Sequence, residues 1–546
     1  MNQELDHRKR KVDEEFIQHP LQTVCELATD LRVYSLVGET TSHLVFRNGR
    51  GLLIDCHSAQ FARWLARCGL PVPELILHTH VQPEHCREAD QFSSARILVH
   101  EQLAELASDR AAYERAAHTT WDNPSEWMET LGREKYGVAG SITIFPPESS
   151  LKVAGTFRDG ERLVWQDLVF EAIPLSGHSR HHVGFMLELN GVPLAVFTGD
   201  LLCHPAKLVN LYDLETHYGG TALPALPSVL RYLAQCPVQR YFPSTGHAIP
   251  NGPTQALELA DAIDAYQQSL CWQSGDFQPA PQPEYPRVGR YLQLHKGVYQ
   301  LNNFGNCILL IDDQGRGLMF DPGPCDFESQ MRIVDFHRDL DLFERECGLC
   351  TVDLVLVTHA HGDHYDMAPE LRKRYPACRV GAWDLVARVI EAPWDYPYPA
   401  LLPWYNLGFD HVAVDAVLSE NTPFFWHDVA IRSLHLPGHC YCHAAYLLSF
   451  NGLNLAITGD TIQSRGEAGG LDFNIANHSV PDDRSGVLKT YRQMVGERVD
   501  LNLGGHGSHF RDCAALYRES LVKIEYALPY LRRLVPGGDL EAALRR

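Results

Sequence analysis

The segment His359-Ala-His361-Gly-Asp363-His364 gathers metal-binding side chains within six residues. Side chains two apart in an extended segment point the same way, so His359 and His361 can hold one ion together. Gly362 permits a tight turn, after which Asp363 and His364 can serve a second ion a few ångströms away. We therefore predict a two-metal site in which Asp363 is also catalytic, because a carboxylate can orient water and carry a proton.

Three residues farther along the chain complete the predicted site. His439 would complete the first metal position and His506 the second, while Asp460, at a strand end, could bridge both ions with its two oxygens. Imidazole and carboxylate ligands suit zinc, iron or manganese without distinguishing among them. We expect two divalent ions here, zinc in the first place, with iron and manganese as alternatives. The predicted C-terminal ligands are His359, His361, Asp363, His364, His439, Asp460 and His506.

The chain reads as the same unit twice, and a repeat of this length fixes the interpretation of the whole fold. An apolar strand running into Thr-Gly-Asp occurs at 191–200 and again at 452–460. A Gly-His pair precedes each copy and another follows it. The spacings nearly coincide, at 22 positions from His178 to Asp200, 21 from His439 to Asp460, 47 from Asp200 to His247, and 46 from Asp460 to His506.

Earlier landmarks also recur in both halves. One apolar strand ends in an aspartate, Asp55 or Asp321, and the next ends in a histidine cluster. A proline-rich stretch at 277–287 disfavours helix and interior strand and is typical of a semi-rigid linker. The sequence therefore predicts two domains, at 1–276 and 288–546, joined by that linker.

The motif His-x-His-x-Asp-His, with Pro437-Gly-His439, Thr458-Gly-Asp460 and Gly505-His506, resembles the metallo-β-lactamase superfamily, especially its glyoxalase II-like and lactonase-like branches. The resemblance implies an α+β fold, a four-layer αββα sandwich, in two tandem copies. It implies a two-metal site at one edge of the two sheets and hydroxide attack on an electrophilic centre. It also implies supporting roles beside the ligands for Asp55, Asp321, His182 and His443.

The N-terminal motif, His78-Thr-His80-Val-Gln-Pro-Glu84-His85, departs from this pattern. Read from His78, it has two residues inserted before the acidic position, and Glu84 replaces aspartate as a second candidate catalytic group. The insertion is expected to re-aim Glu84 and His85. Three interpretations remain open: a functional variant site, a site for one metal ion, and a degenerate structural copy. The predicted ligands, for one or two ions, are His78, His80, Glu84, His85, His178, Asp200 and His247.

Composition excludes several partners. With 47 basic and 68 acidic residues, the net charge of −21 disfavours nucleic acid, whose binding requires Lys and Arg to displace counterions. The first residues are polar and lack the apolar stretch of a secretory signal, and the sequence contains no apolar run of roughly 18 residues, so we expect a soluble cytoplasmic protein without a membrane partner. Its partner is expected to be a small-molecule substrate, and a homo-oligomer remains open.

These observations favour a metal-dependent hydrolase with a dinuclear site, acting on a small ester, thioester, lactone or similar substrate. The alternative is an iron-dependent oxygenase on the same ligands, of the persulfide dioxygenase or diiron tailoring type, because ligand type leaves the metal open. A third class is a binding or scaffold protein without catalysis, which the complete C-terminal ligand set disfavours.

Overall fold

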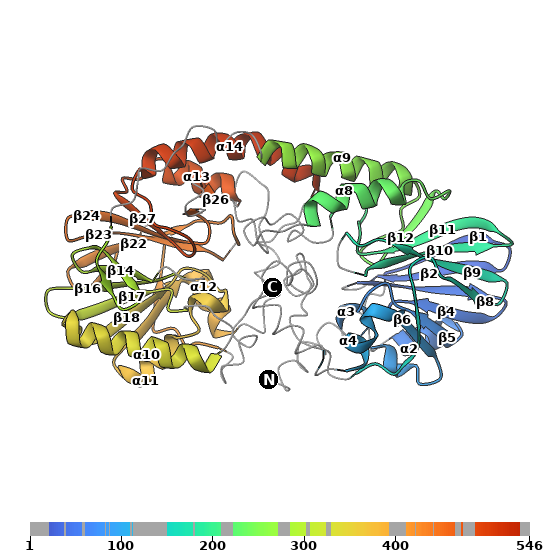
Figure 1. The fold of residues 1–546 in the computed structure, drawn as a ribbon, viewed down its shortest axis with the longest axis horizontal. Coiled ribbons are helices and arrows are strands. Elements are labelled where there is room, and N and C mark those ends of the chain that lie inside the picture. Colours follow the sequence, from blue (N-terminus) through green and yellow to red (C-terminus); the bar gives the residue numbers. More distant parts are fainter. Residues whose placement is uncertain are drawn as a thin grey trace. The chain divides into compact units, whose positions relative to one another are not determined.

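The chain folds into two compact units, one within residues 2–267 and the other within 268–532 (Figure 1). The predicted linker lies mostly outside the described residues, and strand β13 begins at Arg287. Among the helices that are described, none is long and apolar enough to cross a membrane. The computed structural model describes residues 21–534 apart from 38–39, 57–60, 82, 87, 110–111, 113–149, 178–180, 209–221, 271–283, 302–305, 324–328, 393–410, 421, 441, 465–470 and 473–485.

The N-terminal unit contains two mixed sheets. In the first, β1 to β4 run antiparallel and β4 to β7 parallel, in chain order. The second has the order β12-β11-β10-β9-β8, with β12 parallel to β11. The strands are β1 Leu21–Ala28, β2 Leu31–Val37, β3 Thr41–Arg47, β4 Arg50–Ile54, β5 Pro73–Leu77, β6 Arg96–His100, β7 Val153–Phe157, β8 Arg162–Trp165, β9 Leu168–Pro174, β10 Val183–Leu189, β11 Val192–Gly199 and β12 Arg240–Pro243.

The C-terminal unit repeats this topology. Its first sheet runs β13 to β20 in chain order and turns parallel from β17 onward, and its second has the order β21-β22-β23-β24-β27. The strands are β13 Arg287–Val288, β14 Tyr291–His295, β15 Val298–Leu301, β16 Cys307–Ile311, β17 Arg316–Phe320, β18 Thr351–Val357, β19 Arg379–Trp383, β20 Ala416–Leu418, β21 Phe424–Trp426, β22 Val429–His435, β23 Ala444–Phe450, β24 Leu453–Gly459 and β27 Leu501–Gly504, with a separate pair, β25 Gln463–Ser464 and β26 Leu471–Asp472.

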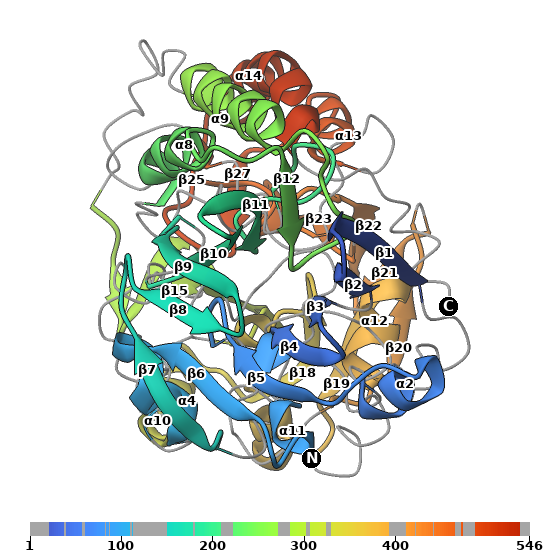
Figure 2. The ribbon, with the colours of Figure 1, turned by 90° about the vertical axis from the view of Figure 1, so that its right-hand side faces the viewer.

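Helices cover the outer faces of both sheets in each unit, as Figure 2 shows for the N-terminal one. On the first sheets, α2 buries Phe61 and α10 buries Phe336. On the second sheets, the Tyr241 hydroxyl of β12 donates to the Leu233 carbonyl of α8, and Tyr517 of α14 donates to Asn502 of β27. The principal helices are α2 Phe61–Cys68, α3 Pro83–Cys86, α4 Ala104–Ser108, α8 Ala222–Leu233, α9 Gly252–Leu270, α10 Ser329–Glu346, α11 Ala368–Arg374, α12 Asp384–Glu391, α13 Val487–Met494 and α14 Cys513–Leu534.

A hydrophobic core fills the space between the two sheets of each unit. In the N-terminal unit, Leu77 of the first sheet and Phe197 of the second are both fully buried in it. In the C-terminal unit, Leu356 and Ile457 take these roles. Each unit is therefore a four-layer αββα sandwich, which confirms the predicted fold class.

His43, on β3 of the N-terminal unit, makes the stability of that unit depend on pH. Its ring is buried, with Nε2 2.9 Å from the Pro243 carbonyl and Nδ1 2.8 Å from the Ser35 hydroxyl. Burial lowers the pKa of His43 to about 4, against an unperturbed value of 6.5. Between pH 6.5 and 4, His43 is protonated in the unfolded chain but mostly neutral in the folded chain. The free energy of unfolding therefore falls as the pH drops toward 4.

We expect this histidine to account for about 3 kcal/mol of lost stability between neutral pH and pH 4, from 1.36 kcal/mol per pKa unit. Urea unfolding of His43→Gln should show a smaller pH dependence over that range than the unaltered chain. The exposed His411 gives the control His411→Gln, which should keep the original dependence. Equal pH dependence in both variants would contradict the assignment.

Candidate metal centre

The C-terminal site lies where two parallel strands end. β17 and β18 pair through Phe320 and Leu356, so the residues that follow them, Asp321 and Thr358, come together. Asp321 has a left-handed backbone (φ 47°), which aspartate tolerates better than most residues, and its carboxylate accepts from the Thr358 amide at 2.8 Å and hydroxyl at 2.7 Å. His359 follows Thr358 directly, so this clamp fixes where the histidine motif leaves the sheet.

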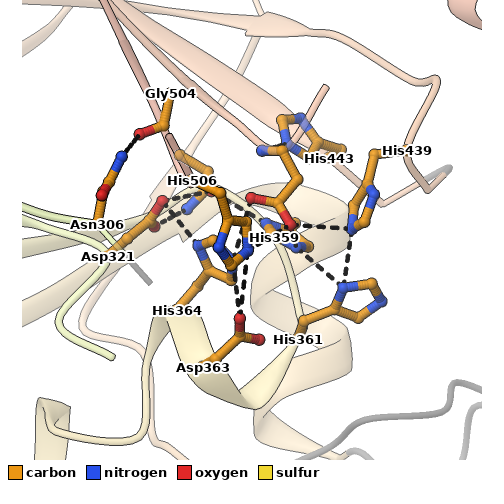
Figure 3. Close-up of polar contacts among 12 residues, drawn as sticks. Asn306, Asp321, His359, His361, Asp363, His364, His439, His443, Gly504 and His506 are labelled. Atoms are coloured by element: carbon orange, nitrogen blue, oxygen red, sulfur yellow. Dashed lines mark hydrogen bonds and ion pairs between the residues drawn. The ribbon is translucent and has the colours of Figure 1, made fainter. Parts of the chain in front are cut away.

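All of the predicted C-terminal ligands converge (Figure 3). The Nδ1 atom of His361 lies 3.1 Å from Nε2 of His359 and 2.9 Å from Nε2 of His439. The 3-10 turn Gly362–His364 then carries Asp363 and His364 into a group with His506. One cluster is His359, His361, His439 and Asp460, and the adjoining one is Asp363, His364 and His506.

Asp460 stands between the two clusters. Its Oδ1 lies 3.3 Å from Nε2 of His364, and its Oδ2 lies 3.1 Å from Nε2 of His506 and 3.4 Å from Nε2 of His439. Oδ2 of Asp363 lies 3.5 Å from Nε2 of both His364 and His506. Oδ2 of Asp460 thus faces ligands of both clusters, and Oδ1 faces His364 of the second, so this carboxylate joins the two clusters.

The arrangement fits two metal ions. Ligands at about 2.0–2.1 Å around a tetrahedral ion stand roughly 3.3 Å apart, close to the separations found here. Nε2 of His361 is buried and lacks a hydrogen-bond partner within the described part of the chain, and buried Oδ1 of Asp460 has only the 3.3 Å contact with His364. Such atoms are costly to bury unless something satisfies them, and a cation would do so. The donor set of five imidazoles and two carboxylates is chemically suited to divalent transition metals.

The protonation of the C-terminal site suits metal binding. Burial lowers the pKa of His359 well below its ordinary value and that of His361 to about 4, so both rings are neutral donors. Burial alone would raise the pKa of Asp460 and of Asp363, but the surrounding histidines, His364 and His506 among them, lower both well below the ordinary value. Burial lowers the pKa of His364 and His506, but the neighbouring carboxylates, Asp460 first among them, outweigh burial and raise both pKa values. Cations would replace these protons.

Residues behind the ligands hold them in place. Nδ1 of His364 lies 3.1 Å from Oδ2 of Asp321, and the Asp460 amide donates to Nε2 of His443 at 3.2 Å. Asn306 donates from Nδ2 to the carbonyls of Gly504 (Figure 3) and Gly507, which holds the loop that carries His506. Asn306 was not predicted from the sequence. Such contacts orient metal ligands and tune their basicity.

The N-terminal unit contains the same clamp. Its hydrogen bonds show that the alignment of the two histidine motifs assumed from the sequence, which pairs His78 with His359, is wrong. The Asp55 carboxylate accepts from the amide and hydroxyl of Thr79, each at 2.9 Å, as Asp321 does from Thr358. Nδ1 of His80 lies 2.8 Å from the Thr79 hydroxyl, as Nδ1 of His359 lies 3.1 Å from that of Thr358. His80, not His78, is therefore the counterpart of His359.

With this register the N-terminal motif has no insertion. Gln82 corresponds to His361, Glu84 to Asp363, and His85 to His364. The expectation that His85 is re-aimed is wrong, because its Nδ1 lies 3.5 Å from Asp55 and its Nε2 2.9 Å from Asp200, the relations that His364 has with Asp321 and Asp460. His78 corresponds to Val357. It is buried, with Nδ1 3.5 Å from Asp55, and is absent from the described ligand clusters.

The loop after β12 also differs from the prediction. The Ser244 amide donates to the Gly199 carbonyl at 2.9 Å, just as the Gly505 amide donates to Gly459 at 2.8 Å. Thr245 is thus the counterpart of His506, and its hydroxyl donates to Oδ1 of Asp200 at 2.8 Å. His247 is exposed and joins none of the clusters found in the described residues, which corrects its assignment as a ligand.

What remains of the predicted N-terminal ligand set is one described cluster, His80, His85 and Asp200. Glu84 lies on α3, but its side chain is outside the described residues, as is His178 altogether. The signal for the correct register was present in the sequence. A Thr-His pair occurs at Thr79-His80 and at Thr358-His359, and alignment on this pair removes the apparent insertion.

Comparison with known proteins identifies the class. Residues 302–506 match the family model of the metallo-beta-lactamase superfamily. This region, which contains every C-terminal ligand, belongs to that superfamily, and the predicted resemblance is confirmed.

Individual relatives match at low identity. A hydroxyacylglutathione hydrolase of Aeromonas salmonicida is 27% identical over 161 residues, which is 30% of this chain and 48% of the relative. A lactamase-like protein of Pestalotiopsis microspora is 23% identical over 253 residues, or 45% of this chain and 62% of the relative. The chain thus spans about half the length of these curated relatives. A metallo-beta-lactamase family structure from Thermus thermophilus is 22% identical with a TM-score of 0.33, covering 46% of this chain and 85% of its own.

Proposed function

We propose that the protein is a metal-dependent hydrolase with a dinuclear active site in the C-terminal unit. The observation that supports this most is the convergence of five imidazoles and two carboxylates, with Asp460 between the two clusters. Residues from four separate parts of the chain meet there, at 359–364, 439, 460 and 506. Packing alone does not require so many buried polar groups, which are costly unless paired or bound to a metal.

Two divalent ions bound there would lower the pKa of water and polarise the scissile carbonyl. Asp363 is placed to accept a proton from the attacking water and pass it to the leaving group, because its carboxylate is anionic and belongs to the second cluster, 3.5 Å from Nε2 of His506. His361 and His439 fix the geometry of the first cluster. Asp321 and Thr358 hold the motif against the sheet so that little rearrangement accompanies the reaction.

The proposed substrate is a small thioester, ester or lactone. The name of the Aeromonas salmonicida relative, hydroxyacylglutathione hydrolase, supports a thioester, and a Thermococcus onnurineus relative is named a metal-dependent hydrolase. The net charge of −21 makes nucleic acid an unfavourable substrate.

Metal content and reaction chemistry test the proposal together. Protein made without added metal is analysed by elemental mass spectrometry and then assayed against a panel of thioesters, aryl esters and lactones, with oxygen uptake followed in parallel. We expect at least two ions per chain, hydrolysis without oxygen uptake, and loss of activity on removal of the ions by a chelator. Iron accompanied by oxygen uptake and no hydrolysis would replace the proposal with an oxygenase.

A further inference from the structure

The N-terminal cluster differs from the C-terminal one at the carboxylate between the metal positions. In the C-terminal unit, Oδ1 of Asp460 lies 3.3 Å from Nε2 of His364, and Oδ2 lies 3.1 Å from Nε2 of His506. In the N-terminal unit, Oδ1 of Asp200 accepts from the Thr245 hydroxyl at 2.8 Å, and Oδ2 lies 2.9 Å from Nε2 of His85. The oxygen of Asp200 that matches Oδ2 of Asp460 thus meets the Thr245 hydroxyl where the C-terminal unit has the imidazole ligand His506, so Asp200 is suited to one ion and not to a bridge.

A second difference leads to the same conclusion. Gly505 leaves room for the Asp460 carboxylate, since a Cβ at Gly505 would lie 2.1 Å from Oδ1 of Asp460. The counterpart of Gly505 is Ser244, which has a Cβ and whose hydroxyl donates to Asp55 at 2.7 Å. The space that the bridging oxygen takes in the C-terminal unit is therefore occupied in the N-terminal unit.

The support for three ligands is nevertheless retained. His80 has the Thr79 hydroxyl at its Nδ1, His85 has Asp55 at its Nδ1, and the Asp200 amide donates to Nε2 of His182 at 3.2 Å. These contacts match those that hold His359, His364 and Asp460. The ligand atoms of His80, His85 and Asp200 lie within 4.8 Å of one another and are buried. Two oriented imidazoles and a carboxylate thus form a metal site with fewer ligands than the C-terminal one.

We propose that the N-terminal unit binds a single divalent transition-metal ion through His80, His85 and Asp200, so that the full chain carries three ions. Two imidazoles and one carboxylate suit zinc, iron or manganese. The Thr245 hydroxyl and the Ser244 side chain stand where the second metal position would need a histidine and open space. This inference concerns the N-terminal unit alone and does not depend on what the C-terminal site catalyses.

The test uses the full chain and zinc as the only metal. A variant with His361→Ala and Asp460→Ala disables the C-terminal site. Each protein is stripped with a chelator, loaded with zinc, desalted, and analysed for zinc per chain by elemental mass spectrometry. We expect three ions in the unaltered chain and one in the disabled variant. No ion in the disabled variant would leave only the His85–Asp200 ion pair and overturn the proposal, and two ions would show a second metal position and overturn it as well.

Ligand identity is tested in the same disabled background. His80→Ala should remove the remaining ion, whereas the matched variant His78→Val should keep it, because His78 is the counterpart of Val357. The reverse result would restore the register assumed from the sequence and overturn the assignment. Asp200→Asn is a milder second variant that should also lose the ion. Circular dichroism checks the fold, and zinc should raise the unfolding temperature of the disabled variant only while His80 is present.

The outcomes separate this inference from the proposed function. If the C-terminal unit bound no zinc while the disabled variant still bound one ion, the proposed function would fail and the N-terminal site would stand. If the unaltered chain bound two ions and hydrolysed its substrate while the disabled variant bound none, only the N-terminal site would fail.

Discussion

Replacement of Asp363 by asparagine is expected to lower kcat for the hydrolysed substrate by about 10²–10⁴-fold, the usual contribution of a positioned proton acceptor. The amide keeps the size of the side chain but cannot accept the proton of the attacking water. It also weakens the second cluster, because Asp363 faces His364 and His506 at 3.5 Å. Steady-state kinetics and zinc content should be measured on the same samples. Loss of an ion lowers the zinc content, whereas loss of the proton acceptor alone lowers kcat at full zinc content.

The matched control is Asp313→Asn, which makes the same chemical change at an exposed ion pair with Lys296 in the same unit. It should leave kcat and zinc content unaltered, because exposed pairs contribute little. Full activity of Asp363→Asn with two ions still bound in the C-terminal unit would show that this carboxylate does not carry the proton.

Replacement of Gly505 by alanine is expected to abolish the two-metal site, although Gly505 is not a ligand and lies outside the motif at 359–364. The added Cβ would lie 2.1 Å from Oδ1 of Asp460 and 2.7 Å from Cε1 of His364. Both distances are far shorter than van der Waals contact, so the carboxylate must turn away from its bridging position. We expect zinc in the C-terminal unit to fall from two ions to one or none and kcat to fall at least about 100-fold, as when metal-orienting groups are lost.

Gly496→Ala provides the comparison for this variant. Gly496 is exposed, and the nearest atom to an added Cβ would be the Gln493 carbonyl oxygen at 3.4 Å. That substitution should leave zinc content and kcat unchanged. If Gly505→Ala bound two ions as tightly as the original protein, the position assigned to the Asp460 carboxylate would be incorrect.

The sequence predicted the fold and the C-terminal site because both depend on local patterns. Apolar runs that end in Asp321 and in His359 read as buried strands, and the structure contains β17 and β18 there. Parallel pairing brings their ends to one edge of the sheet, so residues far apart in the chain meet. The spacing of Asp460 and His506 relative to the motif was sufficient to select them as ligands.

The N-terminal site could not be predicted as well, because residue type suggested a wrong register. His78 and His247 resemble ligands in the sequence, yet the hydrogen bonds of Asp55 and the loop after β12 assign the equivalent positions to His80 and Thr245. A shift of two residues preserves the side-chain alternation of a strand. Strand pattern alone therefore could not reveal either shift, whereas the hydrogen bonds of Asp55 reveal the first and the backbone contact from Ser244 to Gly199 reveals the second.

The clamp formed by Asp321 and Thr358 is made entirely of protein groups, and Asp55 and Thr79 build the same clamp around a smaller set of ligands. Small zinc-binding domains are often unfolded until metal arrives. Here hydrogen bonds within the chain fix the strand ends, and the neighbouring carboxylates raise the pKa of His364 and His506, which favours their protonated forms before an ion binds. Maturation of this protein would then begin with folding. Metal ions would bind afterwards, each replacing protons in a site that the folded chain has already formed.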